Sequence, residues 1–358
     1  MEIPLDRTFE GGTYQVAKRC TVITSIRTDD SEIVGRVYNG DPRVGMSDVV
    51  GVINSVLEPM LVGQDPLLRQ KLWTDMSHKL VSFKEHDIAM QALAGVDCAL
   101  WDVIGKLAGM SVAELLGACR RKVPLIAIGG YYEAGKSNKM LGEEMQELQR
   151  LGVTGCKLKI GQLSPQEDAE RFRAAREGAG PEFVLAADAN RAWTVEQAVE
   201  FAHAVEDLNM AWFEEPCHWF DDVNSMRRVR EKITQPVCAG QSEISSQGVR
   251  HLIENRAIDI LNFDVSESGG VSQWRMANTL AELHGLAVGH HEESQIATHL
   301  LCSTRRPTYV ECFAPDRDPV FWRLPKSGPR LVDGFLELPD GSGFGLELDE
   351  DIIEEYRV

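Results

Sequence analysis

Several features that define common protein classes are missing from this sequence of 358 residues. It contains no CxxC pair, and its dispersed cysteines predict reduced, mostly buried thiols. No apolar run approaches the roughly 18 residues of a membrane span, and the first residues lack the apolar core of a signal peptide. These absences predict a cytoplasmic protein without a membrane partner. The cysteines are Cys20, Cys98, Cys119, Cys156, Cys217, Cys238, Cys302 and Cys312.

Positive charge is also scarce, because 37 Lys and Arg residues stand against 55 Asp and Glu residues, for a formal net charge of −18. A nucleic-acid partner requires a basic face, so we exclude one. The negative net charge does not exclude a small anionic substrate, because Lys, Arg and metal charges near a binding site can outweigh the net charge of the whole protein. No GxGxxG follows a predicted strand, which argues against nucleotide binding. No HExxH motif is present, which argues against a zinc hydrolase built on the His290–Glu293 run.

Residues 1–120 have the pattern of one α+β domain. Thr21–Ile26 alternates as a strand, and Glu32–Tyr38 is a second strand that can pair with it. Ser47 is a candidate cap for a helix that follows. Ile88–Leu107 repeats apolar residues at helical spacing, which is typical of core packing.

From about residue 123 the pattern changes to short apolar strands that alternate with amphipathic helices, on a unit of about 25 residues. Such alternation predicts parallel strands, because each helix returns the chain to the same end of the sheet. Eight strands favour a closed TIM-type barrel over residues 121–322, with an open doubly wound sheet as the alternative. The tail, residues 323–358, is expected to pack back on the N-terminal domain. The predicted strands are Leu125–Ile128, Cys156–Ile160, Phe183–Ala187, Met210–Phe213, Val237–Ala239, Ile258–Asn262, Leu286–Val288 and Thr308–Val310.

Polar residues recur at the carboxyl ends of these strands, about one strand–helix unit apart. That end of a TIM barrel is where such enzymes keep their catalytic residues, so we expect these side chains to meet there. A polar residue at one strand end is weak evidence for an active site, because strand ends are often polar. A series of polar residues at the same position of successive strands is much more specific. The series comprises Lys157, Lys159, Asp188, Asn190, Glu214, Glu215, Gln241, Asp264, His291 and Glu311.

Asp188 and Glu214 on neighbouring strands predict a Mg²⁺ site, because magnesium prefers oxygen ligands. A third ligand is expected near the next strand end. Gln241 and Glu243 share a face if that strand stays extended, so either one is a candidate. A simple salt-bridged rim is the alternative interpretation of these residues.

Two groups are candidate proton carriers. Lys157 and Lys159 are two residues apart and should both face the barrel interior, where mutual repulsion predicts a lowered pKa for one of them. His291 is expected to bond to Asp264, which would fix its tautomer and raise its basicity. Glu311, if burial keeps it protonated, could donate a hydrogen bond to a substrate carboxylate.

In this order and spacing, the residues resemble the mandelate racemase subgroup of the enolase superfamily over nearly the whole chain. The segment Val96–Asp102 with Gly105-Lys106, and the Phe213–Pro216 motif, resemble family signatures. The resemblance implies a (β/α)7β barrel with an N-terminal α+β capping domain, completed by the C-terminal tail. It also implies a homo-oligomer, such as an octamer.

The resemblance implies roles for individual residues. Lys159 is similar to the acid/base on one face of the substrate, and His291 with Asp264 to the acid/base on the opposite face. Lys157 resembles the contact to the substrate carboxylate, and Glu311 the donor to the enediolate. Asp188 and Glu214 resemble metal ligands. Asn190 is expected to line the substrate pocket, and Tyr14 belongs to a cap loop that closes over it.

Three departures from the family pattern stand out. The usual third ligand is Glu, and that slot holds Gln241, so either its amide oxygen or Glu243 completes the site. His290 and Glu293 extend an unusual polar cluster around His291, and we expect them to contact substrate. We expect the family's first strand, near Glu2, to be short or absent.

The predicted activity is removal of the proton α to a carboxylate with stabilisation of the enediolate. We favour dehydration of a sugar acid to a 2-keto-3-deoxy acid, because a polar pocket suits a polyol. The alternatives are a racemase, epimerase or cycloisomerase of a carboxylate and, in another class, a non-catalytic sugar-acid binding protein.

Overall fold

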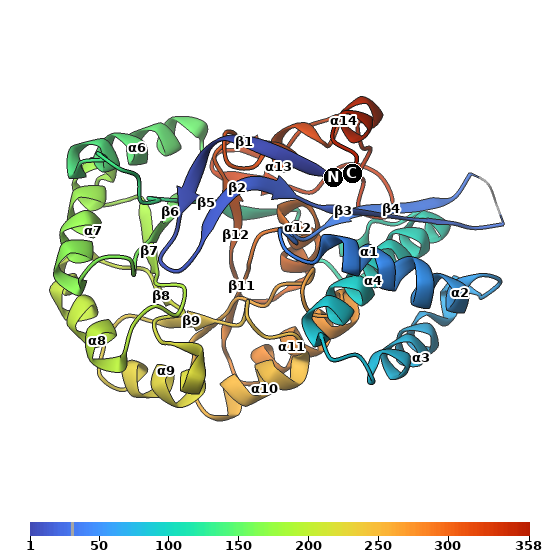
Figure 1. Cartoon of the computed structure of the whole chain (residues 1–358), viewed down its shortest axis with the longest axis horizontal. Coiled ribbons are helices and arrows are strands. Elements are labelled where there is room, and N and C mark those ends of the chain that lie inside the picture. Colours follow the sequence, from blue (N-terminus) through green and yellow to red (C-terminus); the bar gives the residue numbers. More distant parts are fainter. Residues whose placement is uncertain (30–31) are drawn as a thin grey trace.

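The computed structural model describes residues 1–29 and 32–358 of the chain. Between residues 122 and 313, all of which are described, eight parallel strands close into a barrel because the last strand pairs with the first. Seven helices alternate with the strands and surround them (Figure 1), which confirms the predicted (β/α)7β barrel. The strands are β5 (Lys122–Gly129), β6 (Gly155–Lys159), β7 (Val184–Asp188), β8 (Phe213–Glu214), β9 (Val237–Ala239), β10 (Ile260–Leu261), β11 (Ala287–His290) and β12 (Pro307–Phe313).

Helix starts in the barrel follow from the residues that precede them. The side chain of Ser164 caps α7 in a reciprocal capping box with Glu167, and Thr194 caps α8 in the same way with Gln197. Ser137 and Ser245 cap α6 and α10. The helices are α6 (Asn138–Leu151), α7 (Pro165–Ala179), α8 (Val195–Ala204), α9 (Asp222–Arg230), α10 (Ser246–Glu254), α11 (Val271–Leu283) and α12 (Ser294–Ser303).

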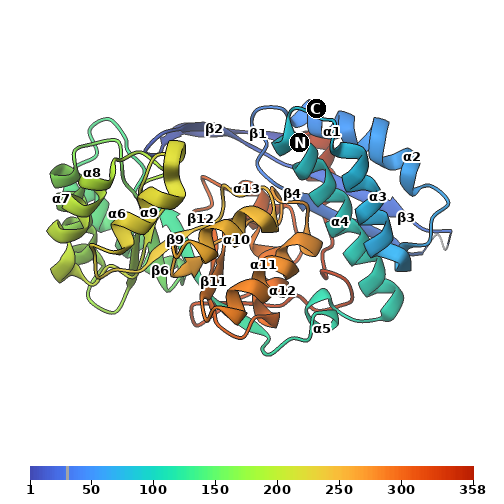
Figure 2. The ribbon, with the colours of Figure 1, turned by 90° about the horizontal axis from the view of Figure 1, so that it is seen from below.

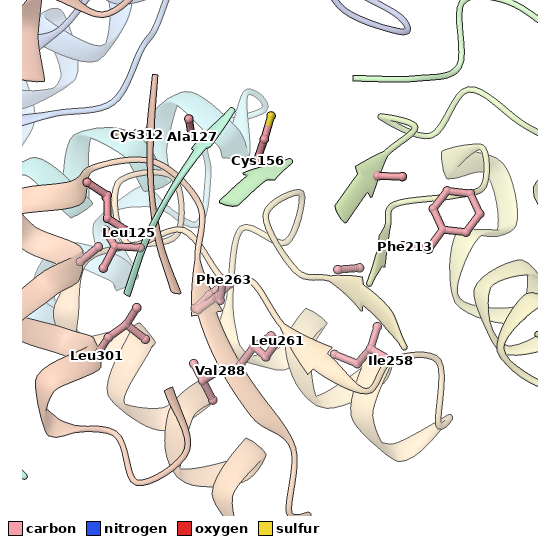
Figure 3. Close-up of a cluster of buried hydrophobic side chains, with 14 of the residues drawn as sticks. Leu125, Ala127, Cys156, Phe213, Ile258, Leu261, Phe263, Val288, Leu301 and Cys312 are labelled. Atoms are coloured by element: carbon pink, nitrogen blue, oxygen red, sulfur yellow. The ribbon is translucent and has the colours of Figure 1, made fainter. Parts of the chain in front are cut away.

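Alternation along the strands separates an outer apolar layer from a polar interior. Cys156 of β6 belongs to the core between strands and helices, together with Leu125 and Val288 (Figure 3). Leu158 of the same strand belongs to this core as well. The intervening Lys157 therefore points into the barrel, where it is fully buried. The packing of the outer layer thus forces the charged side chains of this strand inward.

The N-terminal part of the chain forms two antiparallel hairpins and a group of helices. The hairpin of β3 and β4 confirms the two predicted strands. The helices of this N-terminal part lie beside the barrel, and the hairpin of β1 and β2 reaches from them to the barrel (Figure 2). The elements are β1 (Glu2–Glu10), β2 (Gln15–Cys20), β3 (Val22–Arg27), β4 (Val34–Asn39), α1 (Met46–Val52), α2 (Glu58–Leu61), α3 (Arg69–Leu80), α4 (His86–Ala108) and α5 (Val112–Leu115).

Two local predictions for this part of the chain are wrong. The first strand is not short: β1 spans nine residues and pairs with β2 through a register shift between Pro4 and Phe9. Ser47 is not a helix cap, because α1 begins after Gly45, whose φ of 81° suits glycine. Ser47 therefore lies inside the first turn of α1.

The tail packs on the N-terminal hairpins and also on the barrel, where Phe335–Glu337 pair antiparallel with β5. Leu348 and Ile353 pack with Ile3 and Tyr38 in one apolar cluster. The amide of Glu2 donates to the carbonyl of Tyr356 at 3.0 Å, so the two ends of the chain lie together (Figure 1). The tail elements are α13 (Pro319–Arg323), β13 (Leu331–Val332), β14 (Phe335–Glu337) and α14 (Glu350–Glu355).

Helix α4 is long and apolar enough to cross a membrane by length and composition, contrary to the sequence-based statement that no run approaches that length. A second candidate, the pair Met46–Leu61 and Pro66–Leu80, is bent by 115°. In α4, 78% of the apolar window is buried inside the protein, which is typical of a core helix. All eight cysteines are free, and only Cys119 among these described residues is exposed.

Candidate active site

The structure brings the polar strand ends together at one end of the barrel. Register pairs Lys159 on β6 with Asp188 on β7, and Asp188 with Glu214 on β8. Glu311 lies on β12, and His291 directly follows β11. Strands β6 and β11 are separated by β5 and β12 on one side and by four strands on the other. Lys159 and His291 therefore approach from different sides of the ring.

Lys157 is the centre of a buried charged cluster. Its Nζ lies 2.5 Å from an oxygen of Glu214, 2.6 Å from Glu311 and 3.6 Å from Asp188. Glu214 also accepts from Asn262 Nδ2 at 3.1 Å. Burial raises the pKa of Glu214 to about 7, although the Lys157 ammonium acts in the opposite direction.

Lys159 bonds to Asp188, with Nζ 2.7 Å from Oδ2, and lies 5.3 Å from the ring centroid of Tyr14. Burial disfavours the ammonium, but the Asp188 carboxylate outweighs it and raises the pKa of Lys159. Burial of Asp188 raises the pKa of its carboxyl group, but the charges of Lys159 and Lys157 outweigh burial and lower this pKa to about 2. The prediction that one lysine has a lowered pKa is therefore wrong for these side chains alone, because the neighbouring carboxylates outweigh the repulsion between Lys157 and Lys159.

Asn190 fixes Asp188 and contacts the cap. Its amide N–H and its Nδ2 donate to the Asp188 carboxylate at 2.8 and 3.3 Å. Its carbonyl accepts from Thr13 Oγ1 at 3.1 Å, while its Oδ1 is buried without a partner among the described residues. A free acceptor next to the carboxylates fits the predicted position in the substrate pocket.

Gln241 and Glu243 point in different directions, so only one suits a third ligand. Gln241 donates Nε2 to Glu215 at 3.1 Å, and its Oε1 is buried without a hydrogen-bond partner in the described residues. Glu243 instead turns toward the start of α10, where a Cβ on Gly248 would lie 1.8 Å from its Oε2. Strand β9 ends at Ala239, and Gly240 has a φ of 136°, so the assumed extended backbone does not continue.

The donor set fits a hard cation. Asp188 and Glu214 are cross-strand neighbours at the ends of β7 and β8, and Gln241, two residues after the end of β9, has a free amide oxygen that could serve as a third donor. No group of three His, Cys, Asp or Glu side chains among the described residues has metal-binding geometry. Two facts account for this: the third donor is an amide, and Lys157 draws both carboxylates toward itself. The free amide oxygen of Gln241 therefore favours Gln241 over Glu243 as the third ligand.

His291 and Asp264 form the predicted pair. His291 Nδ1 lies 2.7 Å from Asp264 Oδ2, and Asp264 Oδ1 accepts from the amide and the hydroxyl of Ser266 at 2.7 Å each. His291 Nε2 lies 3.6 Å from Glu292. Burial disfavours the imidazolium, but Glu292 and Asp264 outweigh it and raise the pKa of His291 to about 10. The ring is therefore protonated at neutral pH.

His290 and Glu293, predicted to contact substrate, are bonded to other groups of the protein. His290 is fully buried, its Nε2 accepts from the Val265 amide at 3.2 Å, and its Nδ1 donates to the His291 carbonyl at 2.7 Å. Both ring nitrogens are thus occupied by backbone. Glu293 is 4% exposed and pairs with Arg19 of β2 at 3.4 Å. These contacts within the protein do not support the predicted substrate contacts, and the side chains of adjacent residues diverge here because Glu292 and Glu293 both have positive φ.

The cap loop closes on the site as predicted for Tyr14. A Cβ on Gly12 would lie 2.4 Å from the carbonyl of Ile160, so only glycine allows the loop to lie this close to the strand ends. Tyr132 donates its amide to Glu10 at 2.9 Å and ties the same hairpin to the end of β5. The loop therefore holds the Tyr14 ring beside Lys159.

Sequence reasoning missed the roles of three residues at this end of the barrel. Glu215 accepts from Gln241 and from Ser242 Oγ, and so orients the amide of Gln241. Its position directly after Glu214 was the available signal. Arg43 and Arg317 also lie beside the site, but neither stands at a strand end in phase with the other polar residues.

Comparisons with known proteins agree with this geometry. The family described as "Mandelate racemase / muconate lactonizing enzyme, N-terminal domain" matches residues 10–117, and "Enolase C-terminal domain-like" matches residues 140–352. Arabinonate dehydratase of Saccharolobus solfataricus is 32% identical, over 94% of this chain and 90% of that protein. D-galactarolactone cycloisomerase of Agrobacterium fabrum is 30% identical, and the match covers 100% of this chain and 97% of that protein.

A solved structure extends the likeness to three dimensions. A mandelate racemase/muconate lactonizing enzyme from a marine actinobacterium, in complex with magnesium, superposes with a TM-score of 0.92. It is 41% identical, and the match covers 99% of both chains. A capped barrel with paired proton carriers at its mouth defines the class, and the chain belongs to the mandelate racemase/muconate lactonizing enzyme family of the enolase superfamily.

Proposed function

We propose that this protein is a magnesium-dependent enzyme that removes the proton α to the carboxylate of a sugar acid and eliminates water, to give a 2-keto-3-deoxy acid. The observation that carries the choice of reaction is the imidazolium of His291, held between Asp264 and Glu292. Solved structures of relatives contain magnesium, and the donor set of Asp188, Glu214 and Gln241 fits that ion.

The substrate carboxylate binds among Lys157, Glu311 and the metal ligands. Magnesium held by these oxygens would supply charge that favours the enediolate and would offset the Asp188 charge that keeps Lys159 protonated. Lys157 adds a fixed positive charge beside the same oxygens, at no cost of reorganisation, because Glu214 and Glu311 already hold it in place. Lys159, in its neutral form, then takes the α proton from one side of the carbon.

His291 supplies a proton on the other side. With a pKa near 10 it is charged at neutral pH, so its first act is that of an acid toward a β-hydroxyl leaving group. A racemase needs the same group to act as a base in one direction, and that pKa makes His291 a poor base at neutral pH. Dehydration is therefore the favoured reaction.

The second candidate is cycloisomerisation or epimerisation of a carboxylate substrate, with the same two proton carriers. The 30% identity to a D-galactarolactone cycloisomerase over the whole chain is the observation that favours it. A non-catalytic binding role finds no support, because the relatives are named as enzymes and Lys159, His291 and Asp264 stand together at the barrel mouth.

We also propose that the enzyme is cytoplasmic and forms a homo-oligomer, such as an octamer. The proposed domains are a cap of residues 1–120, a catalytic barrel of residues 121–322 and a tail of residues 323–358. The tail's contacts with Ile3 and Tyr38 support its place on the cap. Light scattering coupled to size-exclusion chromatography measures the oligomeric state directly.

The test of the function is a library of mono- and diacid sugars, incubated with the enzyme and Mg²⁺ and assayed for α-keto acid. We expect at least one acid to give a 2-keto-3-deoxy product. Isomerised or cyclised product without a keto acid would favour the second candidate. If no acid reacts and none exchanges its α hydrogen with solvent, the proposed function is wrong.

A further inference from the structure

Three arginines gather between the cap and the mouth of the barrel: Arg19 on β2, Arg43 after β4 and Arg317 after β12. Arg19 and Arg317 are equally buried, each 2% exposed. Arg19 has partners on every nitrogen: Nε pairs with Asp318 at 3.0 Å, Nη1 donates to the Gly40 carbonyl at 2.7 Å, and Nη2 lies 3.4 Å from Glu293. Its role is accounted for by the link it makes between cap and barrel.

Arg317 and Arg43 are different, because donor groups remain free on both. Within the described residues, Arg317 Nε and Nη1 and Arg43 Nη1 are buried and have no hydrogen-bond partner. The ion pairs of these two guanidinium groups with Asp41 are long: Arg317 Nη2 lies 3.6 Å and Arg43 Nε 3.5 Å from its Oδ2. A buried N–H group without a hydrogen-bond partner lowers the stability of the fold, and the loss is larger when the group is charged. Their arrangement therefore calls for an acceptor that is anionic.

Both free guanidinium groups lie beside the reacting residues. The Arg43 guanidinium lies 5.5 Å from the Tyr14 ring centroid, and Lys159 Nζ lies 5.3 Å from the same centroid. Arg317 lies 4.4 Å from the ring centroid of Phe313, two residues beyond Glu311 on β12. One oxygen of Asp41 lies within 3.6 Å of both groups, so their side chains are neighbours.

The charge of Glu292 places the arginines in the same space as His291. Burial favours the neutral carboxyl, yet His291, followed by Arg19, Arg317 and Arg43, lowers the pKa of Glu292 to about 2. Glu292 is next to His291 in sequence and within 3.6 Å of its Nε2. The guanidinium groups of Arg43 and Arg317 therefore lie close enough to Glu292 to stabilise its charge, beside the imidazole of His291.

We propose that Arg43 and Arg317 form a subsite for a second carboxylate, so that the preferred substrate is a diacid sugar and not a monoacid. This inference rests on the proposed function and names the substrate class of that same site. A planar guanidinium matches a carboxylate in geometry as well as charge, and two of them at one place provide the three free nitrogens for its two oxygens. A terminal hydroxymethyl group, as in a monoacid, is uncharged and leaves these donors without an anionic partner.

The test compares aldarates with the aldonates that share their configuration, beginning with galactarate and galactonate. Substrates are ranked by kcat/KM in the presence of Mg²⁺, for the native enzyme and for Arg317→Met, Arg317→Lys and Arg43→Met. The control is Arg250→Met, because Arg250 is an exposed cation of α10 that pairs with Glu254 outside the site. Binding of each acid is measured in parallel by calorimetry, which requires no turnover.

We expect the native enzyme to prefer the diacid, and Arg317→Met to lower kcat/KM for the diacid by about 10- to 100-fold, mostly through KM. The monoacid should change less than about threefold, Arg317→Lys should recover part of the loss, and the control should match the native enzyme. Equal losses for diacid and monoacid would show a structural role and overturn the proposal, as would a native preference for monoacids.

Failure of the subsite and failure of the proposed function give different results. If no acid is turned over, calorimetry still reports whether the diacid binds more tightly than its monoacid and whether Arg317→Met removes the difference. A diacid preference in binding that the variant abolishes supports the subsite even then. Equal binding of both acids to the native enzyme overturns it.

Discussion

His291 and Asp264 are joined by a contact of 2.7 Å between Nδ1 and Oδ2, and Asp264 is itself held by two donors from Ser266. This pair fixes the imidazole ring, so that Nε2 is the atom free to exchange a proton. A neighbouring carboxylate, Glu292, lies 3.6 Å from that atom and keeps the ring charged. The arrangement prepares His291 to give a proton before it takes one.

Replacement of Asp264 by Asn should lower kcat by about 10²- to 10⁴-fold, because the ring loses both its fixed orientation and a charge that favours the imidazolium. The fold should survive, since Asn can still accept from the Ser266 amide. Turnover and circular dichroism measure the two effects. Asp207→Asn, at an exposed ion pair with Arg173, is the matched control and should retain full activity. An active Asp264→Asn enzyme would show that the pair does not hold the acid.

Replacement of Glu292 by Gln should move the alkaline limb of the pH–rate profile to lower pH. Glu292 is the main cause that raises the pKa of His291 from 6.5 to about 10, so its loss lets the ring deprotonate earlier. The charged ring also stabilises the fold: this contribution is complete below pH 6.5 and is lost as the pH rises through about 10. In the variant, the melting temperature should therefore fall at lower pH than in the native protein. A limb that does not move would rule out this role for Glu292.

Replacement of Gln241 by Ala should weaken magnesium binding by about 10- to 100-fold, because one of three protein oxygen donors is lost. Glu243→Gln should change the affinity less than threefold, since Glu243 turns toward α10. Titration calorimetry with Mg²⁺ compares the two variants. The opposite order of effects would identify Glu243 as the ligand and would mean that the loop after β9 rearranges when the cation binds.

Two glycines of the tail offer a matched test of packing against α4. Gly343 has a φ of 68°, and a Cβ there would lie 2.1 Å from Asp102 Oδ1, whereas Gly328 has a φ of 60° and no atom within 4 Å. Both substitutions to Ala carry the cost of the left-handed backbone, about 1 kcal/mol. Gly343→Ala should lose about 1–3 kcal/mol more, because Asp102 must move. Similar free energies of unfolding for both variants would show that this contact yields easily.

Much of the fold and the site could be predicted because parallel barrels impose simple rules. Lys157 and Lys159 share a face through the period of two, and Asp188 and Glu214 become neighbours because their strands are adjacent. Those rules hold only while a strand continues. They do not predict which of Gln241 and Glu243 faces inward.

The failures therefore fall where the backbone leaves the strand. Gly240 turns the chain after β9 and separates Gln241 from Glu243, and two consecutive positive φ angles turn Glu293 toward Arg19. The free donors of Arg317 depend on contacts between segments far apart in the sequence, so no local pattern indicates them. Each of these features requires the tertiary structure.

The most direct test of the central claim is exchange of the α hydrogen in D₂O, followed by NMR on an acid that the native enzyme dehydrates. The native enzyme should incorporate deuterium or form the keto acid. His291→Asn should still exchange but form no keto acid, because Lys159 takes the proton while the acid for the leaving group is missing. Lys159→Ala should do neither. Exchange by Lys159→Ala at a rate near that of the native enzyme would contradict the account.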